Sequence, residues 1–175
     1  EFKLSVSTVE HLLGAICGEE IDNVLVQVNG PEIPIMDGSA ADFVNAIRKV
    51  GVERQKTERQ YIEVLKKIEI NEGSKFISIE PLKNNLNIDF EIVYKNTPLI
   101  KSQKKSFNIY KDDLNAVYNS RTFCLYEDID KIKSMGLAKG GSLDNAIVVQ
   151  NNKILNKEGL RYRDEFVMHK ILDCM

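Results

Sequence analysis

The sequence predicts an α+β fold in which each of two halves is a two-layer structure of helices on a sheet. Some segments place apolar residues at helical spacing, and others alternate apolar and polar residues as half-buried strands do. Short turns such as Asn29–Gly30 and Asn151–Asn152 join the alternating segments. A polar, charged connector over 53–60 separates two stretches that each contain both kinds of segment.

The first predicted element is a helix within residues 7–22. Ser7 and Glu10 have the spacing of a capping box, and Gly18 is a natural end point. Its apolar residues recur at helical spacing and are expected to face the core: Val9, Leu12, Leu13 and Ile16.

Two strands and a second helix complete the first half. The alternating segment over 23–28 and the segment over 32–36 flank Asn29–Gly30, which predicts a β-hairpin. Ser39 then serves as the N-cap of a helix that Gly51 ends.

The connector is the expected domain boundary, with an N-terminal domain over 1–54 and a C-terminal domain over 58–175. The second domain is rich in short strands. Its predicted elements are, in order, strands over 61–70, 75–82 and 85–94, a solvated lysine-rich loop over 101–106, a helix over 111–120, a strand over 121–126, a helix that Gly136 closes, a strand at the end of 140–150, a returning strand over 153–156 and a helix from about Asp164.

The composition excludes several classes of protein. With 43% hydrophobic and 29% charged residues the chain is expected to be an ordinary globular protein, and a net charge of −2 provides no basic face for nucleic acid. No apolar run approaches the roughly 20 residues that cross a bilayer, and no signal peptide is apparent. The three cysteines form no C-x-x-C pair, which fits a reducing cytoplasm. Both ends resemble internal sequence, so we expect a piece of a longer protein.

The last predicted helix carries a candidate pair of metal ligands. His169 and Asp173 are spaced i and i+4, so their side chains project from one face and can bind the same ion. The apolar residues lie on the other side of this helix: Val167, Met168, Ile171, Leu172 and Met175. The alternative is a surface His–Asp pair, which contributes only a few tenths of a kcal/mol. The spacing alone does not decide between the two.

The first helix carries the second of the two histidines. His11 lies nearly opposite the apolar residues, so its imidazole is expected to face solvent or another part of the protein. Glu10 lies on the flank, where it suits helix capping and catalysis equally well. Two histidines and one carboxylate complete a common catalytic zinc shell, and a neighbouring glutamate is then a natural general base.

Several long motifs carry a resemblance to a known family. They are STVEHLL, IDNVLVQVNGPEIPIMDGSAADFV, SRTFCLYEDIDKIKSMGLAKGGSLDNAIVV and LNKEGLRYRDEFVMHKILD. In this order they resemble the UDP-3-O-acyl-N-acetylglucosamine deacetylases, bacterial zinc amidases that make the committed step of lipid A (lipopolysaccharide) biosynthesis. The resemblance implies two α/β sandwich domains packed face to face, with the active site between them. It implies hydrolysis of the N-acetyl amide of a UDP-linked, O-acylated amino sugar, with release of acetate.

The resemblance also implies roles for individual residues. Glu10 would be the general base, Thr122 would stabilise the oxyanion, and Lys170 would lie near the substrate's diphosphate. Tyr94 would stack on the uracil. The ligands of a Zn²⁺ ion would be His11, His169 and Asp173. The passage for the acyl chain, for which ordinary core packing is the alternative, would be lined by Phe123, Ile129, Ala138, Gly141, Ser142, Leu143, Ala146 and Val148.

Departures from the family pattern bear on activity. The family's opening strands, and a downstream Gly-His motif whose histidine assists catalysis, lie outside this sequence. Cys124 stands where the family usually has glycine, and Thr97 where histidine is common. The alternative function is a non-catalytic α+β binding module or an inactive remnant. We expect a cytoplasmic bacterial monomer that binds no nucleic acid, and the acylated substrate suggests work at the inner membrane.

Overall fold

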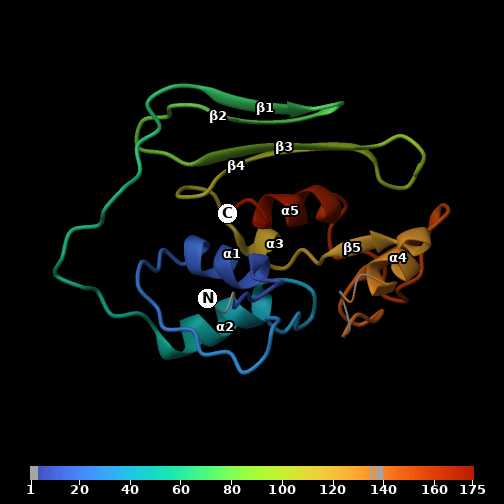
Figure 1. The fold of residues 1–175 in the computed structure, drawn as a ribbon, viewed down its shortest axis with the longest axis horizontal. Helices are drawn as coiled ribbons and strands as arrows, with labels where there is room; N and C mark the ends of the chain where they lie inside the picture. The colour runs from blue at the N-terminus through green and yellow to red at the C-terminus, as the bar shows by residue number, and fades with distance from the viewer. Residues whose placement is uncertain (1–3, 135, 137–139) are drawn as a thin grey trace.

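The computed structural model describes residues 4–134, 136 and 140–175. Helices are mixed with three small sheets, which confirms the predicted α+β class (Figure 1). The elements are, in chain order, α1 (Glu10–Gly18), α2 (Ala41–Val50), β1 (Ile68–Glu72), β2 (Lys75–Ile79), β3 (Asn87–Tyr94), β4 (Lys101–Asn108), α3 (Asn115–Tyr118), β5 (Phe123–Leu125), the 3₁₀ turn η1 (Tyr126–Asp128), α4 (Ile129–Ser134), β6 (Ile147–Gln150), β7 (Lys153–Ile154) and α5 (Glu165–Leu172).

Helix α5 is the centre of the structure. The β3–β4 hairpin lies on one side of it, and α1 and α2 lie on the other (Figure 1). Successive residues of a strand point to opposite faces. In β3, Ile88, Phe90 and Ile92 are therefore withdrawn from solvent, whereas Asp89 and Glu91 are exposed.

Two apolar clusters meet on α5. Met168, Ile171 and Leu172 pack with residues of α1, α2 and α3, whereas Phe166 and Val167 pack with residues of β3 and β6. Burying each such side chain contributes about 1.5–3 kcal/mol. The helix is thus buried nearly all round, including His169 on the side opposite the predicted apolar residues.

The third sheet supports the segment that follows α3. Strand β5 runs parallel to β6, with Phe123 opposite Ile147, and β6 pairs antiparallel with β7. Asn151 forms the tight turn between β6 and β7 with a φ of 52°, as its sequence predicts. Through this sheet the residues before β5 are held next to α5.

Helix α1 begins later than predicted. It starts at Glu10 with Val9 as its N-cap, and among the described residues no side chain caps it. The Ser7 hydroxyl donates instead to the Pro31 carbonyl at 3.1 Å. The predicted capping box is therefore wrong, because the Glu10 side chain makes no capping hydrogen bond.

The buried face of α1 also differs from the prediction. His11, Gly14 and Ala15 are buried, whereas Leu13 is 52% exposed. A Cβ atom on Gly14 would lie 2.7 Å from Cδ1 and 3.1 Å from the carbonyl oxygen of Leu172. The helix therefore packs closely on α5 through its glycine, which turns His11 toward α5.

Residues 23–28 do not form the predicted strand. The segment is irregular, Leu25 is 83% exposed, and Asn29–Gly30 closes no hairpin. Nearby, a single β-bridge pairs Ser7 with Glu32 within the described part of the chain. A strand needs a neighbour for its backbone N–H and C=O groups, and no described strand pairs with this segment.

Residues 101–106 form most of β4 and are not the solvated loop that the lysines predicted. The strand pairs with β3 along its whole length, from Asn87 opposite Asn108 to Tyr94 opposite Lys101. Lys104 lies opposite Glu91, a favourable cross-strand pair. The lysines are tolerated because β4 exposes most of them while Phe107 reaches the core.

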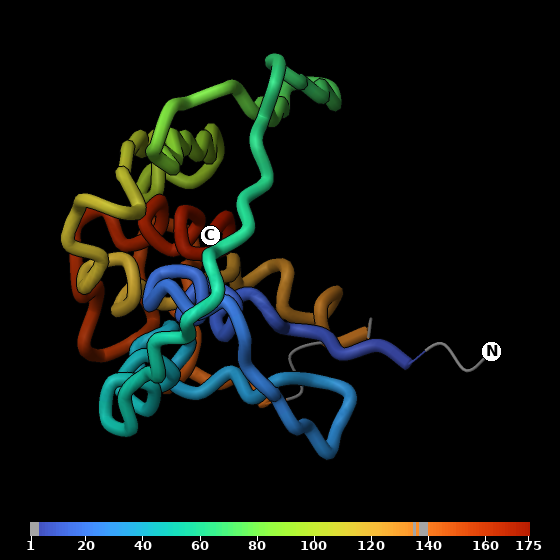
Figure 2. The backbone as a smooth tube through the Cα atoms, turned by 90° about the vertical axis from the view of Figure 1, so that its left-hand side faces the viewer, coloured from blue at the N-terminus to red at the C-terminus, as the bar shows by residue number. Residues whose placement is uncertain are grey.

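The connector after α2 runs in an extended path to the β1–β2 hairpin (Figure 2). Gly51 ends α2 as predicted, with a φ of 79°. Ala40 directly precedes the helix, and the Ser39 hydroxyl accepts from the Ala41 N–H at 3.2 Å, as predicted for a capping serine. Arg59 ties the connector to the end of α1 by donating to Asp22 at 2.9 Å. Beyond it the chain stays irregular until Ile68, so the predicted strand over 61–70 is shorter than expected.

Candidate metal centre

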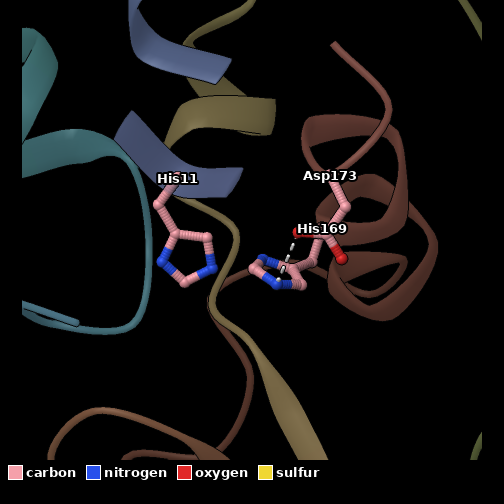
Figure 3. A group of neighbouring side chains, drawn as sticks. All are labelled: His11, His169 and Asp173. Atoms are coloured by element: carbon pink, nitrogen blue, oxygen red, sulfur yellow. Dashed lines mark ion pairs between the residues drawn. The ribbon is translucent and has the colours of Figure 1, made fainter. Parts of the chain in front are cut away.

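His11, His169 and Asp173 come together between α1 and the end of α5 (Figure 3). One ligand atom from each residue lies within 4.8 Å of the others. The imidazole rings are edge to face with their centroids 4.9 Å apart, and His169 Nε2 lies 3.3 Å from Asp173 Oδ1. The histidines lie near opposite ends of the chain, so their meeting depends on the packing of α1 on α5.

The three side chains leave polar atoms without partners. His11 is 3% exposed and His169 is 1% exposed. Among the described residues, His11 Nδ1 and Asp173 Oδ1 are buried and have no hydrogen-bond partner. A buried polar atom without a partner costs about 1–3 kcal/mol, so native structures keep few of them. A cation bound between these atoms would satisfy both, and the donor set therefore fits a metal ion.

Burial keeps both imidazoles neutral. It lowers the pKa of His169 to about 4, although the nearby Asp173 carboxylate opposes this shift. Burial likewise lowers the pKa of His11, against the same carboxylate. Neutral imidazole is the form that binds a metal, so neither ring must lose a proton first at neutral pH.

The tautomer of His169 follows from its hydrogen bond. His169 Nδ1 lies 2.9 Å from the carbonyl oxygen of Ser120, which can only accept. The hydrogen therefore resides on Nδ1, and Nε2 keeps its lone pair facing Asp173 and His11. This arrangement orients the ring as metal-binding histidines are usually oriented.

Of the other residues with predicted roles in catalysis, Glu10 and Lys170 adjoin the cluster. Glu10 adjoins His11 and is half-buried. Lys170 Nζ donates to Asp173 Oδ2 at 2.8 Å and lies 5.7 Å from the centre of the Phe123 ring. Thr122 is held by its backbone, since its N–H donates to the Gly38 carbonyl at 2.7 Å.

A cavity of about 380 Å³ lies along β5 and α4. Thr122 contributes to its wall. The predicted passage residues that line it are Phe123, Ile129, Gly141, Ser142, Leu143, Ala146 and Val148. Ala138, also predicted, lies outside the described residues. Tyr94 does not line the cavity and instead packs edge-on against Phe123 at 6.0 Å.

Sequence reasoning missed part of the cavity wall and its support. The additional lining residues are Ile35, Cys124, Tyr126, Ile132, Lys133 and Leu155. Ile35 comes from the first half of the chain, and no local pattern relates it to β5. Asn156 is 4% exposed, and its amide bonds the backbone of the loop that carries the lining residues. A lone asparagine after a strand has no sequence signal for this role.

The sequence model of the UDP-3-O-acyl N-acetylglycosamine deacetylase family matches residues 1–175. The chain belongs to this family. It is similar to proteins named UDP-3-O-acyl-N-acetylglucosamine deacetylase from Haemophilus ducreyi (43% identical over 97% of the chain) and Campylobacter fetus (44% over 99%). A third relative of the same name, from an Anaeromyxobacter species, is 46% identical over 97% of the chain. The chain spans 56%, 58% and 56% of these three relatives.

The family membership agrees with the resemblance that the motifs carry. The motif STVEHLL supplies His11 on α1, and the last motif supplies His169 and Asp173 on α5. Of the helices in the described part of this deacetylase-family chain, none combines the length and the apolar character needed to cross a membrane.

Proposed function

We propose that the protein containing this chain is a metal-dependent deacetylase. It would hydrolyse the N-acetyl amide of UDP-3-O-acyl-N-acetylglucosamine to the free amine and acetate, the committed step of lipid A biosynthesis. Relatives at 43–46% identity carry this enzyme name. The observation that carries the proposal is the buried convergence of His11, His169 and Asp173 from two helices far apart in the chain.

We propose Zn²⁺ as the metal. Two imidazoles and a carboxylate are a common protein part of a catalytic zinc shell, with room left for water and substrate. A bound zinc ion supplies a Lewis acid that polarises the amide carbonyl and lowers the pKa of water. The partnerless atoms of His11 and Asp173 support a bound metal ion, because both would gain a ligand bond.

The chain's own residues would carry out the proton transfer and the charge stabilisation. Glu10, next to His11 and free of any role as a helix cap, would take the proton of the attacking water. The hydroxyl of Thr122 would donate to the oxyanion of the tetrahedral intermediate. Lys170, held at Asp173, would offer its charge to the diphosphate of the substrate.

We propose that the cavity along β5 receives the acyl chain. Its volume of about 380 Å³ is typical of ligand pockets, and its walls are mainly aliphatic and aromatic. It is adjacent to the metal centre through Thr122 and Phe123, whose ring lies beneath Lys170. Tyr94, which packs edge-on against Phe123, would stack on the uracil.

The whole protein would consist of two sandwich domains that face each other across the metal centre, with residues 1–54 in one and 58–175 in the other. The position of α1 and α2 on one side of α5, and of β3 and β4 on the other, supports this arrangement. The free thiols of Cys17, Cys124 and Cys174 support a cytoplasmic location. We expect a monomer that acts at the inner membrane, where an acylated substrate collects.

A non-catalytic binding module is not favoured. That function requires the His169–Asp173 pair to be a solvated surface feature. His169 is 1% exposed and contacts the ring of His11, so this interpretation of the pair is wrong.

The metal content of the purified chain tests the proposal. After dialysis without chelator, elemental mass spectrometry should find about one zinc per chain. Asp173→Ala should lose most of this zinc, whereas Asp130→Ala, which removes an exposed carboxylate on α4, should retain it. A chain without metal, or equal zinc in both variants, would contradict the proposed centre.

The role of Glu10 is tested in the full-length gene product. Glu10→Ala should abolish most acetate release while zinc stays bound, because the residue would act on water and not on the metal. Loss of zinc in this variant would assign Glu10 a structural role instead.

A further inference from the structure

The proposed chemistry leaves one buried ion pair unused. Arg121 is 2% exposed and Glu165 is 0% exposed. Glu165 precedes His169 by four residues, and Arg121 follows Ser120, whose carbonyl oxygen lies 2.9 Å from His169 Nδ1. Removing two charges from water is costly, and exchange of a buried pair for apolar residues is often neutral or stabilising. A role in stability alone therefore does not account for this pair.

Both members of the pair make several hydrogen bonds. Glu165 Oε1 accepts from the backbone N–H and from Nε of Arg121, each at 3.0 Å. Glu165 Oε2 accepts from the backbone N–H of Arg161 at 2.6 Å. The rest of the guanidinium donates to Glu158 at 2.6 Å and to the Gly159 carbonyl at 2.7 Å. Neither side chain can shift without losing several charge-assisted hydrogen bonds.

The pair lies in register with the metal ligands. Glu165, His169 and Asp173 recur every four residues, so they follow one face of α5 and its C-cap. The segment 120–122 runs along this face. Arg121 bonds Glu165 at the first position, and the Ser120 carbonyl accepts from His169 Nδ1 at the second.

We propose that Arg121 and Glu165 position the metal centre. By clamping Arg121 to the first turn of α5, Glu165 holds the neighbouring Ser120 carbonyl at His169, which keeps the hydrogen on Nδ1 and presents Nε2 to the metal. The same contact fixes the position of Thr122, the residue after Arg121, relative to α5. This inference rests on the proposed function and adds positioning residues that touch neither metal nor substrate.

Two measurements on the purified chain test the clamp in Glu165→Gln, which keeps the shape of the side chain and removes its charge. The zinc dissociation constant, from competition with a chromophoric chelator, should rise about 10–100-fold, as expected when the partner of a metal-binding histidine is disturbed. Long-range ¹H–¹⁵N spectra of the metal-free protein should find His169 in the Nδ1–H tautomer in the wild type and in a tautomer mixture in the variant.

Glu158→Gln is the matched control. Glu158 bonds the same guanidinium but is 55% exposed, so this variant should bind zinc within about twofold of the wild type. If Glu165→Gln does not fold, Arg121→Lys decides by the same two measurements, because it keeps the charge and loses the planar fork. A folded variant with wild-type zinc affinity and the wild-type His169 tautomer would refute the positioning role of Arg121 and Glu165, but not the proposed function. Absence of zinc from the wild type would overturn the proposed function.

Discussion

Asn156 holds the loop that lines the cavity, and its removal can be expressed as a free energy. Its Nδ2 donates to the carbonyls of Leu143 at 2.6 Å and Ala146 at 2.8 Å, and its Oδ1 accepts from the Val148 N–H at 2.9 Å. Leu143, Ala146 and Val148 all contribute to the cavity wall. In Asn156→Ala the loop backbone therefore loses all three of its hydrogen bonds to this side chain.

The magnitude depends on which groups remain buried. Val148 is 6% exposed, so its N–H would stay without a partner at a cost of about 1–3 kcal/mol. The two carbonyls belong to partly exposed residues, and water can replace much of their hydrogen bonding. We expect a total loss of about 2–4 kcal/mol in the free energy of unfolding, which lowers the Tm by roughly 5–15 °C.

Urea unfolding followed by circular dichroism measures the loss of stability. Calorimetric titration with dodecanoate, a soluble acyl chain, measures the affinity of the cavity for its proposed ligand. Asn152→Ala, in the exposed β6–β7 turn, is the control with the same chemical change and should lie within about 0.5 kcal/mol of the wild type. If Asn156→Ala matched this control in both stability and dodecanoate affinity, the loop would not depend on Asn156, and the reasoning would be refuted.

Two further perturbations test other contacts. In Gly14→Val the new side chain would press on Leu172 and push α1 away from α5. Zinc affinity, measured by chelator competition, should fall at least tenfold, and the free energy of unfolding should fall by about 1–3 kcal/mol. Unchanged zinc affinity would contradict the close contact of α1 and α5. Burial pulls the pKa of Asp37 upward, but hydrogen bonds from Ser39 and Arg161 outweigh burial and hold it below its ordinary value. This stabilisation is present above about pH 4 and is lost as pH falls through the folded pKa. The difference in unfolding free energy between wild type and Asp37→Asn should shrink between about pH 5 and pH 2, and a constant difference would argue against the assignment.

Local sequence patterns correctly predicted helix ends and a tight turn, because these features depend on residues that are neighbours in the chain. Gly51 and Gly136 end their helices at positive φ, and Asn151 turns β6 into β7. The patterns failed where pairing decides. Residues 101–106 became a strand because β3 lies beside them, and 23–28 stayed irregular although they alternate correctly. Alternation describes the direction of side chains and cannot reveal whether a partner strand exists.

The candidate site divides in the same way. The pairing of His169 with Asp173 was predicted because the helical period puts residues four apart on one face. The helical period left His11 facing solvent or another part of the protein, and only the resemblance of the motifs implied that it meets His169 and Asp173. The capping box failed because Ser7 bonds Pro31, a residue outside the helix.

By itself the sequence determined the helical face that carries His169 and Asp173, the candidate ligand types and the family, because these depend on spacing and motif order along the chain. Only the tertiary structure decided that His11 meets them within 4.8 Å, that Arg121 and Glu165 pair in the core, and that Asn156 supports the cavity. The physical reason is packing. Gly14 lets α1 approach α5 closely, and such a contact between distant segments depends on the whole core and not on either helix alone.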